Sequence, residues 1–100
     1  MSGETYKVRS EVCLYPGMAG WHFAYVSEKQ SGEIKKKFGK LVKGWGSIPV
    51  TATFGKTSWK TSIFPDKKSG TYLLPLKAQI RKKEGITAGE VIAFSLEIGE

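Results

Sequence analysis

The chain has 100 residues, the size of one domain, so we expect a single domain over residues 1–100 with its ordered core over about residues 5–98. Hydrophobic residues make up 40% of the sequence and charged residues 25%, which excludes a wholly disordered chain. The formal net charge is +7, which permits nucleic acid or an anionic ligand as a partner and agrees equally well with a role in solubility alone.

Cysteine usage and the lengths of the apolar runs define the expected compartment. Cys13 is the only cysteine, so an intrachain disulfide is impossible and a disulfide-stapled secreted scaffold is excluded. The first residues lack the apolar stretch of a signal peptide. No apolar run approaches the about 20 residues that span a bilayer. We therefore expect a cytoplasmic protein with no membrane partner.

The first half of the chain is predicted to form three strands and one helix. Residues 6–15 alternate between two faces, as a strand with one buried face does. Residues 21–26 alternate in the same way, residues 27–37 change to a helical period, and residues 45–54 return to alternation. Because Pro49 has no N–H, the third strand is expected to be an edge strand or to contain a bulge at this position.

The helix predicted over residues 27–37 has signals at both ends. Ser27 and Gln30 have the spacing of a capping box, and Ser31 is a rival N-cap. Gly39 suits the position just beyond the last helical turn, where a left-handed backbone is common.

The second half of the chain is predicted to have the same kinds of element. Residues 57–64 alternate and form a hairpin with the preceding strand, and residues 65–70 have the composition of a turn. A short, nearly all-apolar strand follows over residues 71–76, then a short helix over residues 77–84. A last strand spans residues 89–98.

The two halves contain a weak internal repeat. The segment GEIKKKFG (32–39) aligns without gaps on AQIRKKEG (78–85), and both segments lie between apolar strands. We therefore predict half-repeats over about residues 5–55 and 56–98. One half is too small to bury its own apolar faces, whereas two halves packed together can close a barrel and remove exposed strand edges. The predicted fold class is mainly β: a six-stranded barrel with a pseudo-two-fold axis and two short helices.

The predicted core follows from the apolar face of each element. The helices are expected to cover the ends or openings of the barrel, with Ile34, Phe38, Leu76 and Ile80 facing inward. The full predicted core consists of Val8, Val12, Leu14, Phe23, Ile34, Phe38, Ile48, Val50, Phe54, Ile63, Leu74, Ile80, Ile92, Phe94 and Leu96.

Four blocks of sequence resemble a known family. In order, LYPGMAGWHF, GWGSIPVTATFG, WKTSIFPDKKSGTYLLPLKAQIRKKEGI and GEVIAFSLE look like the bacterial domain-of-unknown-function family 1905, over about residues 6–98. The resemblance implies a double-split β-barrel, a fold shared with the swapped-hairpin transcription factors of the AbrB type. It implies no function.

Two features set this chain apart from the proteins it resembles. Some relatives continue into a C-terminal domain of the bacteriocin-protection type, whose role is not expected here because the sequence stops at Glu100. Factors of the AbrB type build one barrel from two chains. This chain holds both halves, so a monomer is plausible and the dimeric DNA-binding surface of those factors is not implied.

Basic residues in the two predicted helices form the first candidate site. Positive charge at helix faces can neutralise phosphates, so these residues are a possible nucleic-acid surface. The alternative is a solvated helix face, and the chain has only two arginines, the residue that most often reads bases. The candidates are Lys35, Lys36, Lys37, Lys40 and Lys43 in the first run and Arg81, Lys82 and Lys83, preceded by Lys77, in the second.

Aromatic and polar residues of the predicted hairpin form the second candidate site. Trp and Tyr provide stacking surfaces, and Lys side chains could hold an anionic group of a small ligand. The alternative is that the tryptophans are core residues. The possible cleft consists of Trp45, Trp59, Lys60, Ser62, Asp66, Lys67 and Tyr72.

No residue pattern predicts catalysis, a metal or a cofactor. Cys13 and His22 are the only cysteine and histidine, and they would act as nucleophile and base only if they met across two strands. Zinc spacing, P-loop and dinucleotide-binding patterns are absent from the sequence. We expect a non-catalytic domain that binds an anionic small ligand or nucleic acid, with a protein-interaction module as the alternative.

Overall fold

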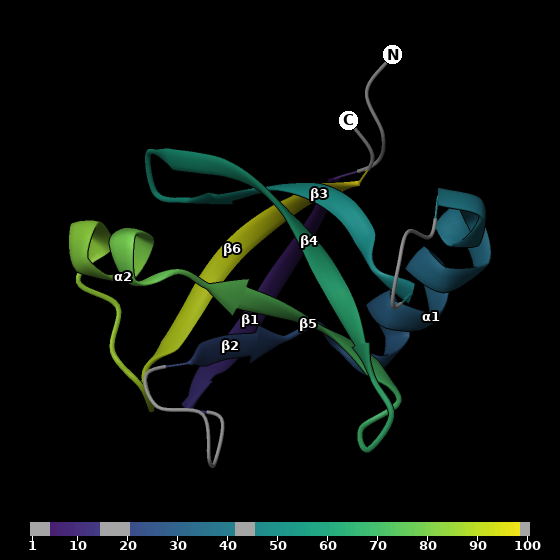
Figure 1. Cartoon of the computed structure of the whole chain (residues 1–100), viewed down its shortest axis with the longest axis horizontal. Coiled ribbons are helices and arrows are strands. Elements are labelled where there is room, and N and C mark those ends of the chain that lie inside the picture. Colours follow the sequence, from purple (N-terminus) through teal and green to yellow (C-terminus); the bar gives the residue numbers. More distant parts are fainter. Residues whose placement is uncertain (1–4, 15–20, 42–45, 99–100) are drawn as a thin grey trace.

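The computed structural model describes residues 5–14, 21–41 and 46–98 of the chain. These residues form six strands and two α-helices, and a short 3₁₀ turn follows the first helix (Figure 1). In chain order the elements are β1 (Thr5–Leu14), β2 (His22–Tyr25), α1 (Glu28–Phe38), η1 (Gly39–Leu41), β3 (Ile48–Phe54), β4 (Thr57–Asp66), β5 (Thr71–Leu76), α2 (Ala78–Glu84) and β6 (Val91–Ile98).

The strands close into an antiparallel barrel in the order β1–β2–β5–β4–β3–β6. The two long strands each change partner along their length. β1 pairs with β6 over residues 5–11 and with β2 over residues 12–14. β4 pairs with β3 over residues 57–63 and with β5 over residues 64–66. Two sheets therefore share β1 and β4, and the prediction of a mainly β, six-stranded barrel with two helices is confirmed.

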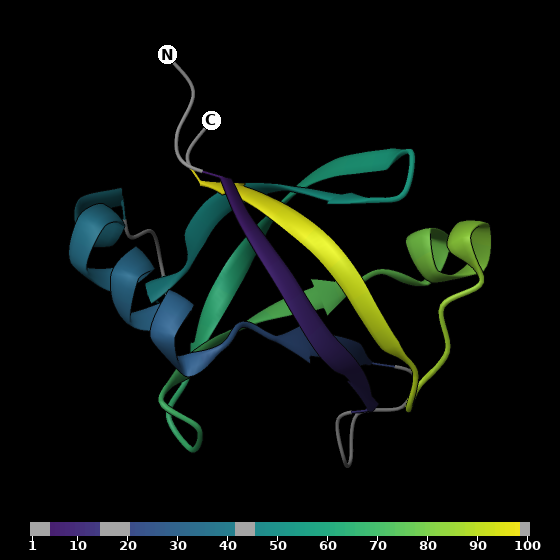
Figure 2. The same cartoon turned by 180° about the vertical axis from the view of Figure 1, so that it is seen from behind.

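The strand order has an internal two-fold symmetry. Exchanging β1, β2 and β3 for β4, β5 and β6 leaves every strand pairing unchanged, and each helix follows the second strand of its half. Seen from either side, α1 and α2 lie at opposite ends of the molecule (Figures 1 and 2). The helix ends differ, however. Gly85 has the left-handed backbone expected after a helix (φ 68°), whereas Gly39 (φ −58°) continues into η1, so the prediction for Gly39 is wrong.

Pro49 does not mark an edge strand. It pairs with Ser62 of β4, and its neighbour Val50 pairs with Ile98 of β6 on the other side of the strand. The prediction of an edge or a bulge is corrected accordingly, since β3 lies between two neighbours in a closed barrel.

The barrel interior holds one continuous hydrophobic core. Most predicted core residues are buried there, whereas Leu14 is 52% exposed and Ile80 is only partly buried. The prediction for Leu14 is wrong because Leu14 is the last residue of β1, beyond the part of this strand that pairs with β6 in the described chain. The core cluster consists of Tyr6, Val8, Val12, Ala24, Val26, Ile34, Ile48, Val50, Ala52, Ile63, Tyr72, Leu74, Leu76, Ile86, Ile92, Phe94, Leu96 and Ile98, with Phe38, Phe54 and Trp59 packed against it.

The face of β2 that points inward is the reverse of the predicted one. Ala24 and Val26 are fully buried within the core cluster. Phe23 lies on the outer face, where its ring contacts Trp21 (centroids 5.4 Å apart) and Tyr25 (5.1 Å, edge to face). Small side chains fit the limited interior of a six-stranded barrel, and the aromatic residues then cover one another outside it.

The two helices are fastened to the barrel in different ways. Ser27 is the N-cap of α1, as predicted, because its Oγ accepts a hydrogen bond from the Gln30 N–H (3.1 Å). Buried Ile34 anchors α1 in the core, and the Gln30 amide donates to the Lys7 carbonyl (2.7 Å). In contrast, α2 contains no buried residue. It does not plug the barrel and remains at its periphery.

Candidate functional site

The residues of the predicted ligand cleft do not share one surface. Side chains alternate along β4, so Trp59 packs against the core while its neighbour Lys60 is exposed on the outer face. Ser62 shares the outer face with Lys60, and Tyr72 is buried in the core. Trp45 lies outside the described residues. The alternative interpretation, that tryptophan contributes to the core, therefore holds for Trp59.

Part of this set lines a groove between α1 and the hairpin that joins β4 to β5. Asp66, Lys67 and Tyr72 meet Lys35 of α1 around a hollow of about 730 Å³. The Asp66 carboxylate accepts hydrogen bonds from the hydroxyl (2.9 Å) and the N–H (3.3 Å) of Ser69 within the hairpin. Burial raises the pKa of the Tyr72 hydroxyl above its ordinary value of 10.0, so this group stays protonated at neutral pH.

The two basic runs form separate patches. Lys35, Lys36, Lys37 and Lys40 are exposed on α1 and η1, and Lys82 and Lys83 are exposed on α2. These helices lie at opposite ends of a molecule whose longest axis is 32 Å (Figure 1). The Nε–H of Arg81 donates to the Leu76 carbonyl (3.1 Å), which ties this arginine to its own half. Lys43 lies outside the described residues.

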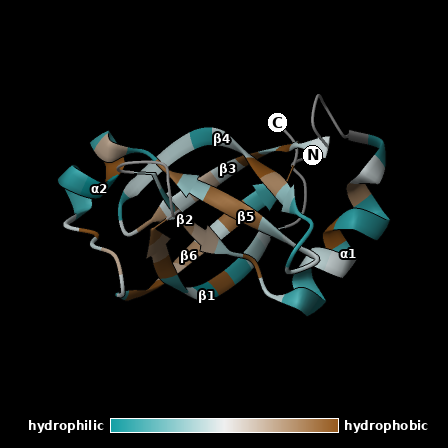
Figure 3. Ribbon diagram, turned by 60° about the horizontal axis from the view of Figure 1, so that its bottom comes forward, coloured by the Kyte–Doolittle hydropathy of each residue, from teal (hydrophilic) through white to brown (hydrophobic). Residues whose placement is uncertain are grey.

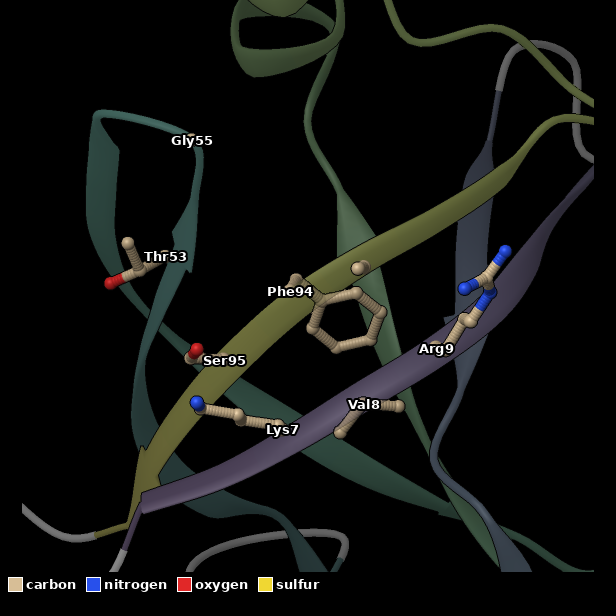
Figure 4. A pocket seen from close by; sticks show the side chains of 8 residues that line it. Lys7, Val8, Arg9, Thr53, Gly55, Phe94 and Ser95 are labelled. Atoms are coloured by element: carbon tan, nitrogen blue, oxygen red, sulfur yellow. The ribbon is translucent and has the colours of Figure 1, made fainter.

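A different pair of cations lines a hollow on the outside of the barrel. Lys7 and Arg9 project from β1 beside a depression of about 280 Å³, which also takes in Thr53 of β3 and Ser95 of β6. Figure 4 shows Lys7 extending towards Ser95, with Arg9 on the same strand. No carboxylate lines this hollow within the described part of the chain.

Strand register explains how this hollow forms. Lys7 lies opposite Ser95, Ser95 lies opposite Thr53, and Arg9 lies opposite Ala93. Long cationic side chains on one strand therefore face short side chains on the next two. Hydrophobic and hydrophilic residues alternate along β1 (Figure 3). Lys7 and Arg9 are exposed and Val8 between them is buried, so both cations lie on the outer face. Their Cα atoms are about 7 Å apart, as for any residues two positions apart in a strand.

The sequence prediction assigned Lys7 and Arg9 no role beyond the polar face of a strand. The signal that would have identified them is a pair of cations two residues apart on an exposed face. Their small neighbours are distant in sequence and become visible only with the register of three strands. Neither cation forms an ion pair with a carboxylate among the described residues.

Cys13 and His22 do not form a nucleophile–base pair. Cys13 lies opposite Phe23 on the outer face. His22 lies opposite Leu14 in the next pair of residues, and side chains of consecutive pairs lie on opposite faces of the sheet. Burial, and then the nearby charge of Glu11, raise the pKa of the Cys13 thiol above its ordinary value of 9.0. Such a thiol is mostly protonated at neutral pH.

Metal ligands and membrane spans can be assessed only for the described segments. Within them, no three histidine, cysteine, aspartate or glutamate side chains gather closely enough to hold a metal ion. In the same segments, neither helix is long and apolar enough to cross a bilayer.

Comparison with protein families shows which family the chain belongs to. A family described as "Domain of unknown function (DUF1905)" matches residues 9–96, which is nearly the whole chain. No curated protein matches the sequence. The match carries no activity, substrate or partner, so a function has to be argued from the geometry of the site.

Proposed function

Since the chain belongs to the DUF1905 family, whose description names no activity, we propose from its geometry that it is a non-catalytic domain that binds an anionic small ligand in the hollow beside Lys7 and Arg9. The observation that carries this proposal is the composition of the hollow, which has two cations, two hydroxyl groups and no carboxylate among its described lining residues. The ligand class is a compound with a phosphate, sulfate or carboxylate group.

The chemistry of the lining residues supports an oxyanion. The planar guanidinium of Arg9 can donate two parallel hydrogen bonds to one oxyanion group, and Lys7 adds a point charge. The hydroxyls of Thr53 and Ser95 can donate to the remaining oxygens. Thr53 already exchanges a hydrogen bond with Ser58 (2.8 Å), which fixes its side chain.

Nucleic acid is the rival anionic partner for the helices. The proposal favours a small ligand at the Lys7–Arg9 hollow because two cations and two hydroxyl groups meet there, whereas the two basic runs lie at opposite ends of the molecule. A non-catalytic role agrees with the placement of Cys13 and His22 on opposite faces. A cytoplasmic location agrees with Cys13 being a free thiol.

Titration with inorganic phosphate tests the proposal. We expect amide chemical shifts to move around Lys7, Arg9 and Ser95 in two-dimensional NMR spectra. The Arg9→Gln variant should weaken binding by about tenfold, near the low end of the range for a charge-assisted hydrogen bond because the hollow is open. Lys7→Gln should also weaken binding.

Lys60→Gln is the matched control, because it removes the same charge from an exposed position of β4 outside the hollow. We expect Lys60→Gln to change the affinity by less than about twofold. Equal weakening by Lys60→Gln and Arg9→Gln would show diffuse attraction to a basic protein and would overturn the proposal, as would unchanged shifts at Ser95.

A further inference from the structure

A third hollow lies on the outer face of β4 and β5, away from the Lys7–Arg9 hollow and next to the groove beside α1, with which it shares Asp66 and Lys67. It measures about 650 Å³, and its apolar walls come from Trp21, Phe64 and Leu73. Lys67 and Lys68 lie at its rim, on the turn that follows β4. This hollow has aromatic walls beside two neighbouring lysines. In the Lys7–Arg9 hollow the one aromatic residue among the described lining residues is Phe94, which is buried in the core.

Strand register builds the apolar wall. Tyr25 of β2, Leu73 of β5 and Phe64 of β4 lie opposite one another in a row across three strands. Phe23 and Leu73 are only 5% exposed although neither belongs to the core cluster, so both are covered on the outer side of the barrel. Trp21 packs on Phe23 at the end of this layer. The rings of Trp21 and Tyr25 both contact Phe23, which holds this end of the layer in place before any ligand arrives.

The charge at the rim is effectively positive. Asp66 is the one acidic residue among the described lining residues, and its carboxylate accepts hydrogen bonds from the N–H and the hydroxyl of Ser69. Lys67 and Lys68 are both exposed, and neither forms an ion pair within the described chain. An occupant of this hollow therefore needs a flat apolar group for Trp21 and Phe64 and negative charge for the two lysines.

We propose that this hollow binds single-stranded nucleic acid, with an unpaired base against Trp21 and Phe64 and the adjoining phosphates at Lys67 and Lys68. Unpaired bases stack on aromatic side chains while basic residues follow the backbone, and every base has a ring face to offer, so little sequence preference is expected. A duplex is a poor occupant, since its bases are already stacked. This site is independent of the proposed anion binding at Lys7 and Arg9.

Fluorescence anisotropy with a labelled oligo-dT of ten nucleotides tests this proposal. We expect binding at low salt that weakens as salt is added. Trp21→Leu and Phe64→Leu keep an apolar wall and remove an aromatic ring, and each should weaken binding by about 5- to 100-fold. Having two such variants keeps the test decisive if one of them fails to fold, which circular dichroism would show.

The lysines are tested with a matched pair of double variants. Lys67→Gln/Lys68→Gln should weaken oligo-dT binding strongly, whereas Lys82→Gln/Lys83→Gln, an equal loss of charge on α2, should change it little. Equal losses in the two double variants would overturn the proposal. So would undiminished binding by folded Trp21→Leu and Phe64→Leu, or tighter binding of the matching duplex.

Two further experiments distinguish nucleic acid from an acidic protein partner, and distinguish this site from the proposed anion site. A poly-glutamate peptide that displaces oligo-dT at equal charge concentration would show that an acidic protein segment is the better occupant, and the proposal would fail. Arg9→Gln should bind oligo-dT normally. If oligo-dT does not bind while phosphate still shifts Ser95, only the second site is rejected and the proposed function stands.

Discussion

At the scale of single residues, the face of a strand on which a side chain lies decides its chemistry here. Cys13 and Val12 are neighbours in sequence, yet Val12 is buried in the core and Cys13 lies on the outer face with an elevated pKa. The same alternation buries Ala24 and leaves Phe23 outside. Sequence periodicity predicted that β2 has two faces, but both faces are apolar, and only the limited space inside the barrel selects the inward one.

Cys13 should react slowly with alkylating reagents in the folded protein. Burial is the larger cause of its raised pKa, and the charge of Glu11 is the smaller one. Because the thiolate is the reactive form, we expect alkylation by iodoacetamide at pH 8 to be several-fold slower than in the urea-unfolded chain. Mass spectrometry of timed samples would measure both rates.

Glu11→Gln should recover part of this difference, since it removes the charge but not the burial. Glu97→Gln, on another strand, is the control and should leave the rate unchanged. If Cys13 reacts as fast in the folded protein as in the unfolded chain, its pKa is not raised by folding and the prediction is wrong.

At the scale of elements, backbone conformation separates two glycines that have the same free space. A Cβ atom at Gly32 in α1, or at Gly70 before β5, would meet no atom within 4 Å. Gly32 has a helical backbone, whereas Gly70 has a φ of 72°. Any difference between alanine substitutions at the two positions must therefore come from the backbone and not from packing.

Gly32→Ala should raise the free energy of unfolding by about 0.5–1 kcal/mol, because alanine loses less conformational entropy than glycine in a helix. Gly70→Ala should lower it by about 1–2 kcal/mol, because a Cβ atom disfavours a left-handed backbone. Urea denaturation of both variants would measure the two changes. Changes of the same sign would show that one of these backbone assignments is wrong.

Most elements could be predicted from periodicity and caps, and the misses have local causes. Ser27 was recognised as an N-cap because its partner is three residues away. The sequence predicts that β4 ends at residue 64, which is too early, because Pro65 and Asp66 have the composition of a turn. The strand continues through them because both pair with β5. Gly39 was misjudged because η1 extends the helix instead of ending it.

At the scale of the whole molecule, closure of the barrel within one chain determines how it should behave in solution. Every strand in the described chain has two neighbours from the same chain, so no edge is offered to a second copy. The repeated segments and the family resemblance were sufficient to predict this architecture. The Lys7–Arg9 hollow was not predictable, since Lys7, Thr53 and Ser95 come from three strands whose register the sequence does not reveal.

The protein should therefore be a monomer. We expect light scattering behind a size-exclusion column to give the mass of one chain, with no change over a wide range of protein concentration. A dimer that dissociates on dilution would contradict this expectation and would indicate that the two halves exchange partners between chains.

The change of partner along β1 and β4 has a consequence for the order of the two halves. The end of β3 pairs with the start of β4 across a tight turn, and in the same way Glu97 near the end of β6 pairs with Thr5 at the start of β1. A circular permutant could join these ends by a short turn and have its new termini at Gly55, between β3 and β4. The second half would then come first in its sequence. Its chain would trace the same barrel, because the topology does not distinguish which half comes first.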